Sequence, residues 1–283
     1  MGTIKKIFTA LGTVNHIEAG FEESEREAAR EALEKAEIYI NDMDDRLSVF
    51  KPDSEISQIN HSAGICDTLV GRDTFDLLAL SKEYGSRTGG AFDITTKPLT
   101  EAGSDNADVD FRDIILNEMR LSVRLKHKRQ GIHLGGIAKG YAVDRVASIL
   151  KHHGITNASI NLGGTVRNIG QSRKVGIRHP FDASKLAAVL ESTDEAVVTS
   201  GLYERGNHIF DPSSGKPAQS DLAAVTVVGS DGAAADAAAT ACMVLGIKQS
   251  VEMLRLFGLE GLFISRNGDI FATEKINSRI QIV

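Results

Sequence analysis

The sequence predicts an α/β fold of the α+β kind, in which helices pack on a mixed sheet. Two observations predict this class: strand-like segments recur along the chain, and amphipathic helical segments interrupt them at irregular intervals. With 42% hydrophobic and 25% charged residues, the chain can bury a core. No repeat, low-complexity tract or long shift in composition divides it, so we expect residues 1–283 to form a single domain.

The N-terminal part is expected to form one strand and two helices. Residues 3–19 alternate and are rich in Ile, Phe, Val and Thr, which predicts a strand bent at Gly12. Residues 22–41 predict a helix, because acidic residues crowd its first turns, where the helix dipole favours them, and an apolar stripe follows. Residues 73–87 predict the second helix.

The middle of the chain is expected to change between loop, strand and helix. The acidic stretch 101–113 predicts a loop or a short helix, and residues 119–126 predict a strand. A helix is expected to begin near Ala138 and to end before Gly154. Alternation then predicts strands in three further segments, which are 158–170, 174–180 and 185–192.

The last third predicts one strand, two helices and a hairpin. Residues 224–230 are apolar and β-branched, as is typical of a strand. Small residues from 233 to 245 predict a helix, and a second helix is expected over 247–257. The segment 259–273 predicts a hairpin that turns at Asn267–Gly268.

Composition and charge argue against two classes of protein. The chain has 32 basic and 38 acidic residues, and a net charge of −6 does not suit a nucleic-acid binder, which needs a basic surface. No segment approaches the roughly 18 apolar residues that a membrane span requires. The N-terminal residues lack both a signal-peptide core and a lipoprotein cysteine, so we expect a cytoplasmic location.

The two cysteines, Cys66 and Cys242, lie far apart in the sequence. Their spacing fits neither a metal motif nor a disulfide framework. We therefore expect two reduced and mostly buried thiols.

Two glycine-rich segments suit the approach of backbone to a ligand. In residues 133–140 (HLGGIAKG), glycines precede a helix whose first N–H groups could bind a phosphate, and Lys139 adds charge. The segment matches neither the Walker A pattern nor GxGxxG, so a strand-to-helix turn that needs small residues explains it as well. Gly163–Gly164 interrupt a strand pattern, which indicates either a bulge or the close approach of a ligand.

Three other clusters place polar side chains among small or apolar ones. Gly89–Gly90 are typical of a helix stop, which leaves Asp93 among its apolar neighbours unexplained. His208 precedes the turn DPSSGKP and could act as a general base near neutral pH, although a lone histidine is more often structural. Asp236 and Thr240 share a helix face and offer two hard oxygen ligands for Mg²⁺. Alternatively, Asp236 stabilises the N-terminus of the helix and the Thr240 hydroxyl donates a hydrogen bond back to a backbone carbonyl.

Taken together and in order, these segments resemble the ApbE family of FAD:protein FMN transferases. The matching segments run almost from end to end of the chain. They are ALGT at 10–13, RLSVFKPDSEISQIN at 46–60, GAFDITTKPL at 90–99, HLGGIAKGYAVDRV at 133–146, INLGG at 160–164, TSG at 199–201, HIFDPSSGKP at 208–217 and ADAAATACMVLG at 235–246.

The resemblance implies a layered ApbE-like fold with FAD in a cleft and Mg²⁺ bridging its pyrophosphate. FMN would move from FAD to a Thr or Ser hydroxyl of a partner flavoprotein through a phosphoester bond, releasing AMP. The acceptors of the family carry a motif close to D-x-x-(S/T)-G-A-(S/T). This chain lacks that motif, so it resembles the transferase and not the acceptor.

The resemblance also implies roles for individual residues. The metal ligands would be Asp236, Thr240 and the backbone carbonyl of Gly136, and His208 would be the base for the acceptor hydroxyl. The positions that the family uses at the cofactor correspond to Leu11, Phe50, Ala91, Phe92, Asp93, His133 and Lys139.

The chain departs from the family in three places. His133 stands where the family usually has Asp, and Leu11 stands where it has Met. The segment between Pro98 and Gly131 is short and lacks the family's Trp. The departures at His133 and in the short segment keep open the alternative of a non-catalytic FAD-binding protein. A second alternative is an Mg²⁺-dependent FAD pyrophosphatase that gives FMN and AMP, because the same metal site would serve with water as the nucleophile.

Overall fold

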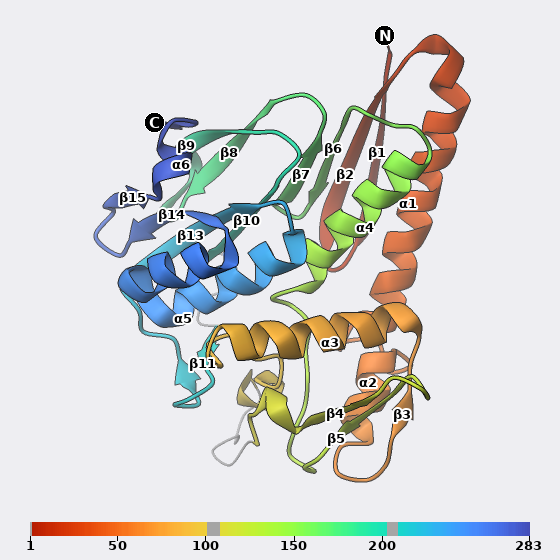
Figure 1. The fold of residues 1–283 in the computed structure, drawn as a ribbon, viewed down its shortest axis with the longest axis vertical. Coiled ribbons are helices and arrows are strands. Elements are labelled where there is room, and N and C mark those ends of the chain that lie inside the picture. The colour runs from red at the N-terminus through yellow and green to blue at the C-terminus, as the bar shows by residue number, and fades with distance from the viewer. Residues whose placement is uncertain (1, 101–107, 203–208) are drawn as a thin grey trace.

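An eight-stranded sheet forms the centre of the molecule (Figure 1). The computed structural model describes residues 2–100, 108–202 and 209–283. Every pair of neighbouring strands in this sheet is antiparallel, so the expected mixture of strand directions is wrong. Short hairpins join several of the neighbours, and a hairpin forces its two strands to run in opposite directions. In sheet order the strands are β1 (Gly2–Ala10), β2 (Thr13–Phe21), β6 (Ala158–Leu162), β7 (Thr165–Ile169), β10 (Ala196–Gly201), β13 (Leu222–Gly229), β14 (Glu260–Ser265) and β15 (Ile270–Ala272).

Two tight turns at one end of the main sheet differ from the sequence predictions. Leu11 and Gly12 have φ values of 54° and 70°, so residues 3–19 form two strands joined by a two-residue turn and not one bent strand. Gly163 and Gly164, with φ values of 59° and 93°, close a second such hairpin in place of the bulge considered above. The two turns are neighbours, because a Cβ on Gly163 would lie 2.5 Å from the Thr13 side chain.

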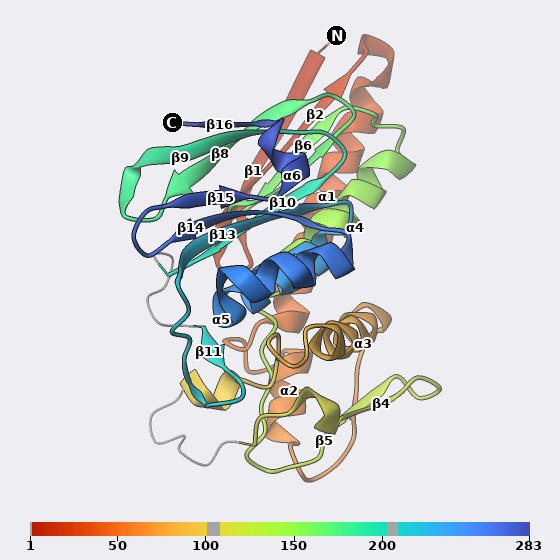
Figure 2. The ribbon, with the colours of Figure 1, turned by 60° about the vertical axis from the view of Figure 1, so that its left-hand side comes forward.

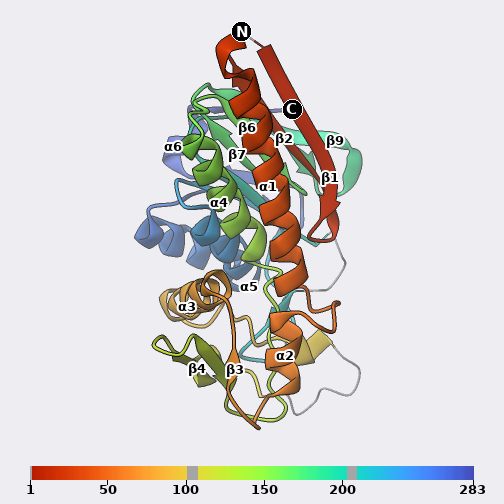
Figure 3. The same cartoon turned by 90° about the vertical axis from the view of Figure 1, so that its right-hand side faces the viewer.

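Three helices cover one face of the sheet, namely α1 (Arg26–Leu47), α4 (Ala138–His152) and α5 (Gly232–Phe257) (Figure 3). Helix α1 runs further than predicted, because its apolar stripe continues through Met43 and Leu47. Helix α5 contains both helices predicted near the C-terminus, which meet at Gly246, where φ is 76° and ψ is 173°. Most of the side chains on α5 are buried, and its many alanines let the neighbouring backbones approach closely.

A smaller antiparallel sheet covers the other face (Figure 2). Its strands are β8 (Arg173–His179), β9 (Asp182–Ser192) and β16 (Ile280–Ile282), and α6 (Glu274–Asn277) lies beside them. Ile177 and Leu190 of this sheet share a second hydrophobic core with Val197 of the main sheet. All eight residues of β13 are buried, since layers lie on both of its faces. The layered α/β fold predicted from the sequence is therefore confirmed.

A third group of elements lies beyond one end of the main sheet (Figure 1). The group comprises β3 (Thr68–Leu69), β4 (Ile114–Asn117), β5 (Ser122–Leu125), α2 (Glu55–His61), α3 (Arg72–Arg87), β11 (Phe210–Asp211) and β12 (Lys216–Pro217), together with 3-10 helices at Lys97–Thr100 and Phe111–Asp113; a further 3-10 helix at Glu23–Glu25 precedes α1. The predictions for α3 and for the strand at β5 are confirmed, whereas α2 and β4 were not predicted. Helix α2 is too short for a periodic pattern, and its start is fixed by the Ser54 side chain, which accepts a hydrogen bond from the Ser57 N–H.

The cysteine prediction is half wrong. Cys242 is buried in α5, but Cys66 is exposed. Cys66 lies in the turn between α2 and β3, where its neighbour Ile65 is exposed as well. In the three described ranges, no helix has both the length and the apolar character to cross a membrane. The single-domain organisation stays a prediction.

Candidate functional site

Helices α4 and α5 touch through two glycines near their N-termini. A Cβ on Gly140 would lie 2.1 Å from the carbonyl oxygen of Gly232, and a Cβ on Gly232 would lie 2.6 Å from that of Gly140. Any side chain at either position would therefore force the two backbones apart. This contact brings the loop that precedes α4 against the first turns of α5.

Two carboxylates hold this helix crossing in register. The Asp236 carboxylate on α5 accepts a hydrogen bond from the Gly140 N–H at 2.8 Å. The Asp144 carboxylate on α4 accepts from the Gly232 N–H at 2.8 Å and from the next N–H of α5 at 3.2 Å. Asp144 also pairs with Arg167, with 2.6 Å between Oδ1 and Nη1. Burial raises the pKa of Asp144 to about 6, and the charge of Arg167 opposes that rise.

The residues expected to bind a metal meet at this crossing. Asp236 and Thr240 lie one turn apart on α5, and a Cβ on Gly136 would come within 2.6 Å of the Thr240 hydroxyl oxygen. Asp236 is 3% exposed, and among the described residues no donor contacts its Oδ1. Burial raises the pKa of Asp236, while the nearby charge of Lys139 and the Gly140 N–H oppose the rise.

The chemistry of these donors fits a hard cation. All three groups would present oxygen, from a carboxylate, a hydroxyl and a backbone carbonyl. No cluster of three or more His, Cys, Asp or Glu side chains that could hold a metal occurs in the described part of the chain. A site with one carboxylate suits Mg²⁺, which usually completes its coordination with water and substrate phosphates. Asp231, and not Asp236, caps α5 by accepting from the Ala234 N–H, whereas Asp236 bonds the Gly140 N–H in the first turn of α4.

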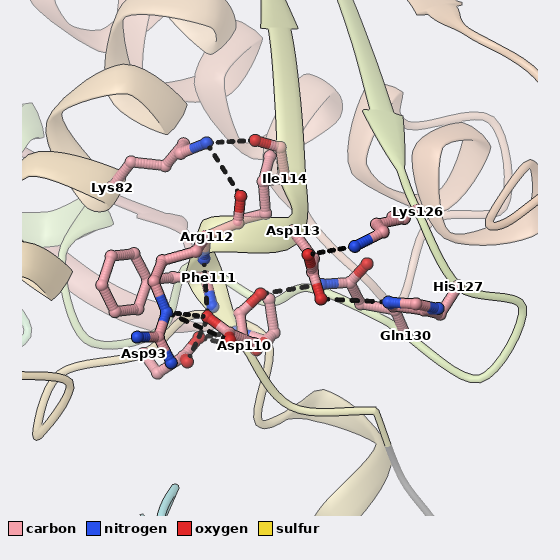
Figure 4. Close-up of polar contacts among 11 residues, drawn as sticks. Lys82, Asp93, Asp110, Phe111, Arg112, Asp113, Ile114, Lys126, His127 and Gln130 are labelled. Carbon is pink, nitrogen blue, oxygen red and sulfur yellow. Dashed lines mark hydrogen bonds and ion pairs between the residues drawn. The ribbon is translucent and has the colours of Figure 1, made fainter.

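Asp93 uses its carboxylate to shape the loop that carries it (Figure 4). One oxygen accepts from the Thr95 N–H at 2.7 Å and from the Thr95 hydroxyl at 2.6 Å, and the other accepts from the Phe111 N–H at 2.9 Å. Burial raises the pKa of Asp93, and these hydrogen bonds oppose that rise. Asp93 thus connects two loops that are separated in the sequence. Its neighbour Phe92 is 2% exposed and belongs to the core.

The segment that follows the Asp93 loop is anchored by further polar contacts (Figure 4). Asp113 pairs with Lys126 and with His127, each at 3.0 Å, and Lys126 lowers the pKa of Asp113. The ammonium group of Lys82 on α3 donates to the Ile114 carbonyl. These contacts hold β4 against β5 and α3, and these elements support the Asp93 loop.

His133 links the Asp93 loop to the loop before α4. Its backbone N–H donates to the Ile94 carbonyl at 2.9 Å, and its Nε2 lies 3.1 Å from the Thr96 hydroxyl. A Cβ on Gly135 would lie 3.4 Å from the His133 ring, so the ring also packs over that glycine. His133 therefore lies at the junction of two of the segments that the sequence singled out.

Leu11 and Phe50 lie close to the C-terminal end of α1. The Leu11 N–H donates to the Asp44 carboxylate at 3.0 Å, and Lys51, which follows Phe50, pairs with the same carboxylate. The side chain of Phe50 is 88% exposed, which leaves an aromatic ring free to contact a ligand.

The antiparallel topology gathers these segments at one end of the main sheet. Strand β2 begins there, β6 ends there, and β10 ends there before the chain continues toward β11. Helix α1 ends and α4 begins at the same end (Figure 1). His208, which the sequence places between β10 and β11, lies outside the described residues.

Sequence analysis did not assign a role to Gly140 or Asp144. Both lie in the segment HLGGIAKGYAVDRV, four residues apart, and therefore share a face of α4. A glycine and an acidic residue at this spacing suggest that a second helix packs closely on α4 and that the carboxylate caps it. That second helix begins about ninety residues later, so only the tertiary structure identifies it as α5.

Comparisons with known proteins bear on the family and the fold of the chain. The model of the ApbE family matches residues 11–263. The chain is 33% identical over 253 residues to a FAD:protein FMN transferase of Klebsiella pneumoniae, covering 80% of each chain. It is 31% identical over 296 aligned positions to a FAD:protein FMN transferase of Treponema pallidum, covering 89% of this chain and 82% of the relative. The solved ApbE protein of Thermotoga maritima is similar with a TM-score of 0.84 at 25% identity, covering 98% of this chain and 99% of that one.

Proposed function

The chain belongs to the ApbE family, and we propose that it is a FAD:protein FMN transferase, which moves FMN from FAD to a hydroxyl of an acceptor flavoprotein. The observation that carries the proposal is the crossing of α4 and α5, which brings the Gly136 backbone, Asp236 and Thr240 together. Oxygen ligands beside helix N-termini suit a pyrophosphate, because phosphate oxygens are stabilised by both a metal ion and helix N–H groups.

The reaction exchanges one phosphorus–oxygen bond for another. The oxygen of an acceptor Thr or Ser hydroxyl attacks the phosphorus of the FMN half of FAD. The bond between that phosphorus and the bridging oxygen breaks, and AMP leaves with the electron pair. The hydroxyl proton passes to a base, and FMN remains joined to the acceptor through a phosphoester bond.

Asp236, Thr240 and the Gly136 carbonyl would hold Mg²⁺. The ion would neutralise the charge of the pyrophosphate and fix its geometry during the attack. The Gly140 N–H bonds one Asp236 oxygen, so the other oxygen would be available as a ligand of the metal.

The remaining predicted residues would act on FAD and on the hydroxyl. Lys139, whose charge acts on Asp236, would contribute positive charge near the phosphates. Leu11, Phe50 and Ala91 would line the flavin pocket, and His133 would contact the cofactor from the junction described above. Phe92 and Asp93 would act by shaping the loop, because the ring is buried and the carboxylate is already bonded. His208 would accept the hydroxyl proton.

One incubation tests the proposal. The purified chain is mixed with FAD, Mg²⁺ and an acceptor that carries the motif D-x-x-(S/T)-G-A-(S/T), and the acceptor is examined for in-gel flavin fluorescence and for the mass of an FMN adduct. An acceptor with alanine at both Ser/Thr positions is the matched control. AMP release without an adduct would favour FAD hydrolysis, and FAD binding without AMP would favour a non-catalytic protein.

His208→Asn tests the proposed base. A general base contributes about 10²–10⁴-fold, so transfer should fall by that factor while FAD binding stays unchanged. Transfer at the wild-type rate would remove His208 from the mechanism. The cytoplasmic location expected from the sequence stays a prediction.

A further inference from the structure

Asp144 on α4 lies at the helix crossing but has no role in the reaction described above. Its carboxylate accepts hydrogen bonds from the first two N–H groups of α5, those of Gly232 at 2.8 Å and Ala233 at 3.2 Å. The cap residue Asp231 accepts from the next one, the Ala234 N–H. Asp144 therefore satisfies two donors at the start of a neighbouring helix, where N–H groups without helical partners carry the positive end of the helix dipole.

The start of α5 lies beside the start of α4 (Figure 1), and residues of the two segments face one another in three successive pairs. The pairs are Gly136 with Thr240, Gly140 with Asp236, and Asp144 with Gly232. Along both segments, each pair lies four residues from the next. The first two pairs contain the proposed metal ligands, and the third pair does not. Because α5 is helical without interruption from Gly232 to Thr240, a movement of its first turn would displace both of the ligands that it carries.

Arg167 on β7 ties the third pair to the main sheet. Its Nη1 lies 2.6 Å from Oδ1 of Asp144 and donates to the Ser230 carbonyl at 2.9 Å. Ser230 leads into α5, so one guanidinium group holds a side chain of α4 and the backbone at the entry to α5. Because the side chain of Arg167 is only 11% exposed, solvent screens this ion pair less than it screens a surface pair.

We propose that Asp144 is a positioning residue for the metal ligands, and that Arg167 in turn fixes Asp144. The inference rests on the proposed function and adds to it the pair of residues that sets Asp236 and Thr240 against the Gly136 carbonyl. In this role Asp144 contacts neither the metal nor FAD. It acts through the first turn of α5, which it holds against α4.

Asp144→Ala tests this role through metal binding alone. The purified chain is titrated with Mn²⁺ in the presence of FAD and without an acceptor, and the free ion is measured by electron paramagnetic resonance. Mn²⁺ serves as the probe because it takes the same oxygen ligands as Mg²⁺. We expect its dissociation constant to rise about tenfold, since groups that hold metal ligands in place change metal affinity about 10–100-fold. An unchanged dissociation constant would overturn the proposal.

Asp144→Asn keeps the test decisive if the alanine variant does not fold. It has the same shape as the native residue, and its amide oxygen can still accept from the Gly232 N–H, but it lacks the charge that pairs with Arg167. We expect its affinity for Mn²⁺ to fall, by less than in the alanine variant. An asparagine variant that bound Mn²⁺ as tightly as the wild type would overturn the proposal.

Arg167→Gln tests the second half of the proposal. It should also weaken Mn²⁺ binding, and combining it with Asp144→Ala should add little to the loss that the alanine variant already shows, because Arg167 acts through Asp144. Fully additive losses would overturn the assignment of Arg167 as the residue that fixes Asp144.

Glu195→Ala is the matched control, because Glu195 also pairs with an arginine, Arg279, at 2.6 Å. The side chains of Asp144 and Glu195 are exposed to a similar degree, 28% and 26%. Glu195 precedes β10 and Arg279 precedes β16, so neither belongs to the helix crossing. The control should lose stability in urea but keep the wild-type dissociation constant for Mn²⁺. A rise as large as that of Asp144→Ala would assign the effect to general destabilisation and overturn the proposal.

The metal titration separates this inference from the proposed function. Weaker Mn²⁺ binding by Asp144→Ala would support the positioning role even if the wild type formed no FMN adduct. Wild-type binding by that variant would refute the positioning role even if FMN transfer occurred. A wild type that bound no Mn²⁺ would refute both the metal site and the positioning role.

Discussion

Gly140→Ala should displace the two helices that form the proposed metal site. The new Cβ would lie 2.1 Å from the Gly232 carbonyl oxygen and 2.6 Å from the Asp236 Cβ. Reaching even 3.0 Å from that oxygen requires a movement of about 0.9 Å. A shift of that size along the Gly140 N–H bond to Asp236 would stretch it from 2.8 Å to beyond hydrogen-bond range.

The cost in stability follows from these two effects. Overpacking of this kind costs about 1–3 kcal/mol. A lost hydrogen bond to a carboxylate adds about 1.5–3 kcal/mol. We therefore expect the free energy of unfolding in urea to fall by about 2.5–6 kcal/mol. Misplacing catalytic groups by about 1 Å can lower the rate about 10²-fold, so FMN transfer should fall by a similar factor.

Gly154→Ala is the matched control at the other end of α4. Gly154 has a positive φ of 79°, which Gly140 does not have, and no atom lies within 4 Å of its added Cβ. The control should lose about 1–2 kcal/mol from backbone strain and keep its transfer rate and Mg²⁺ requirement. If Gly140→Ala lost less than the control and kept the wild-type Mg²⁺ requirement, the tight crossing would not support the site.

Three further predictions address the metal, the buried carboxyl and the thiols. Asp236→Asn and Thr240→Val should each raise the Mg²⁺ concentration for half-maximal transfer about 10–100-fold, and an unchanged Mg²⁺ titration would contradict their role as ligands. The pKa of Asp144 is about 6 in the folded chain, whereas its ordinary value is 3.8. Between these pH values the native state therefore binds a proton that the unfolded state does not. The contribution of Asp144 to stability is thus present below about pH 4 and is lost as pH rises through 6. The effect amounts to about 3 kcal/mol, and Asp144→Asn should remove that slope from urea unfolding measured between pH 4 and 7; parallel curves would refute it. A thiol reagent should modify Cys66 at once and Cys242 only after unfolding, because Cys242 is buried and its pKa is raised to about 12; two fast thiols per chain would contradict this.

Local sequence patterns predicted the helices better than the strand ends. The apolar stripe of α1 and the small residues of α5 repeat over many turns, so neither depends on distant contacts. The turn at Leu11–Gly12 was missed because leucine seldom adopts a positive φ, and an alternating pattern continues unchanged through a two-residue turn. The contact of Leu11 with Asp44 holds this turn against α1, and that contact is not visible in the sequence.

The part of the site whose residues lie close together in the sequence was predictable. Asp236 and Thr240 are four residues apart, so any helix places them on one face. The hydrogen bonds that the Asp93 carboxylate accepts were not predictable, because one of the donors, the Phe111 N–H, lies in a different loop. The exposure of Phe50 likewise depends on what the surrounding chain leaves uncovered.

The sequence by itself determined the family, the main helices and the residue types that the chemistry requires. Only the tertiary structure decided that Gly140 meets Asp236 across 96 residues of chain, and that Asp144 caps a helix to which it does not belong. The physical reason is that helical periodicity is set by nearest neighbours, whereas the approach of two helix backbones depends on every layer packed around them. The glycines that looked like a phosphate loop in the sequence thereby gain a second role, which is to let α4 and α5 touch.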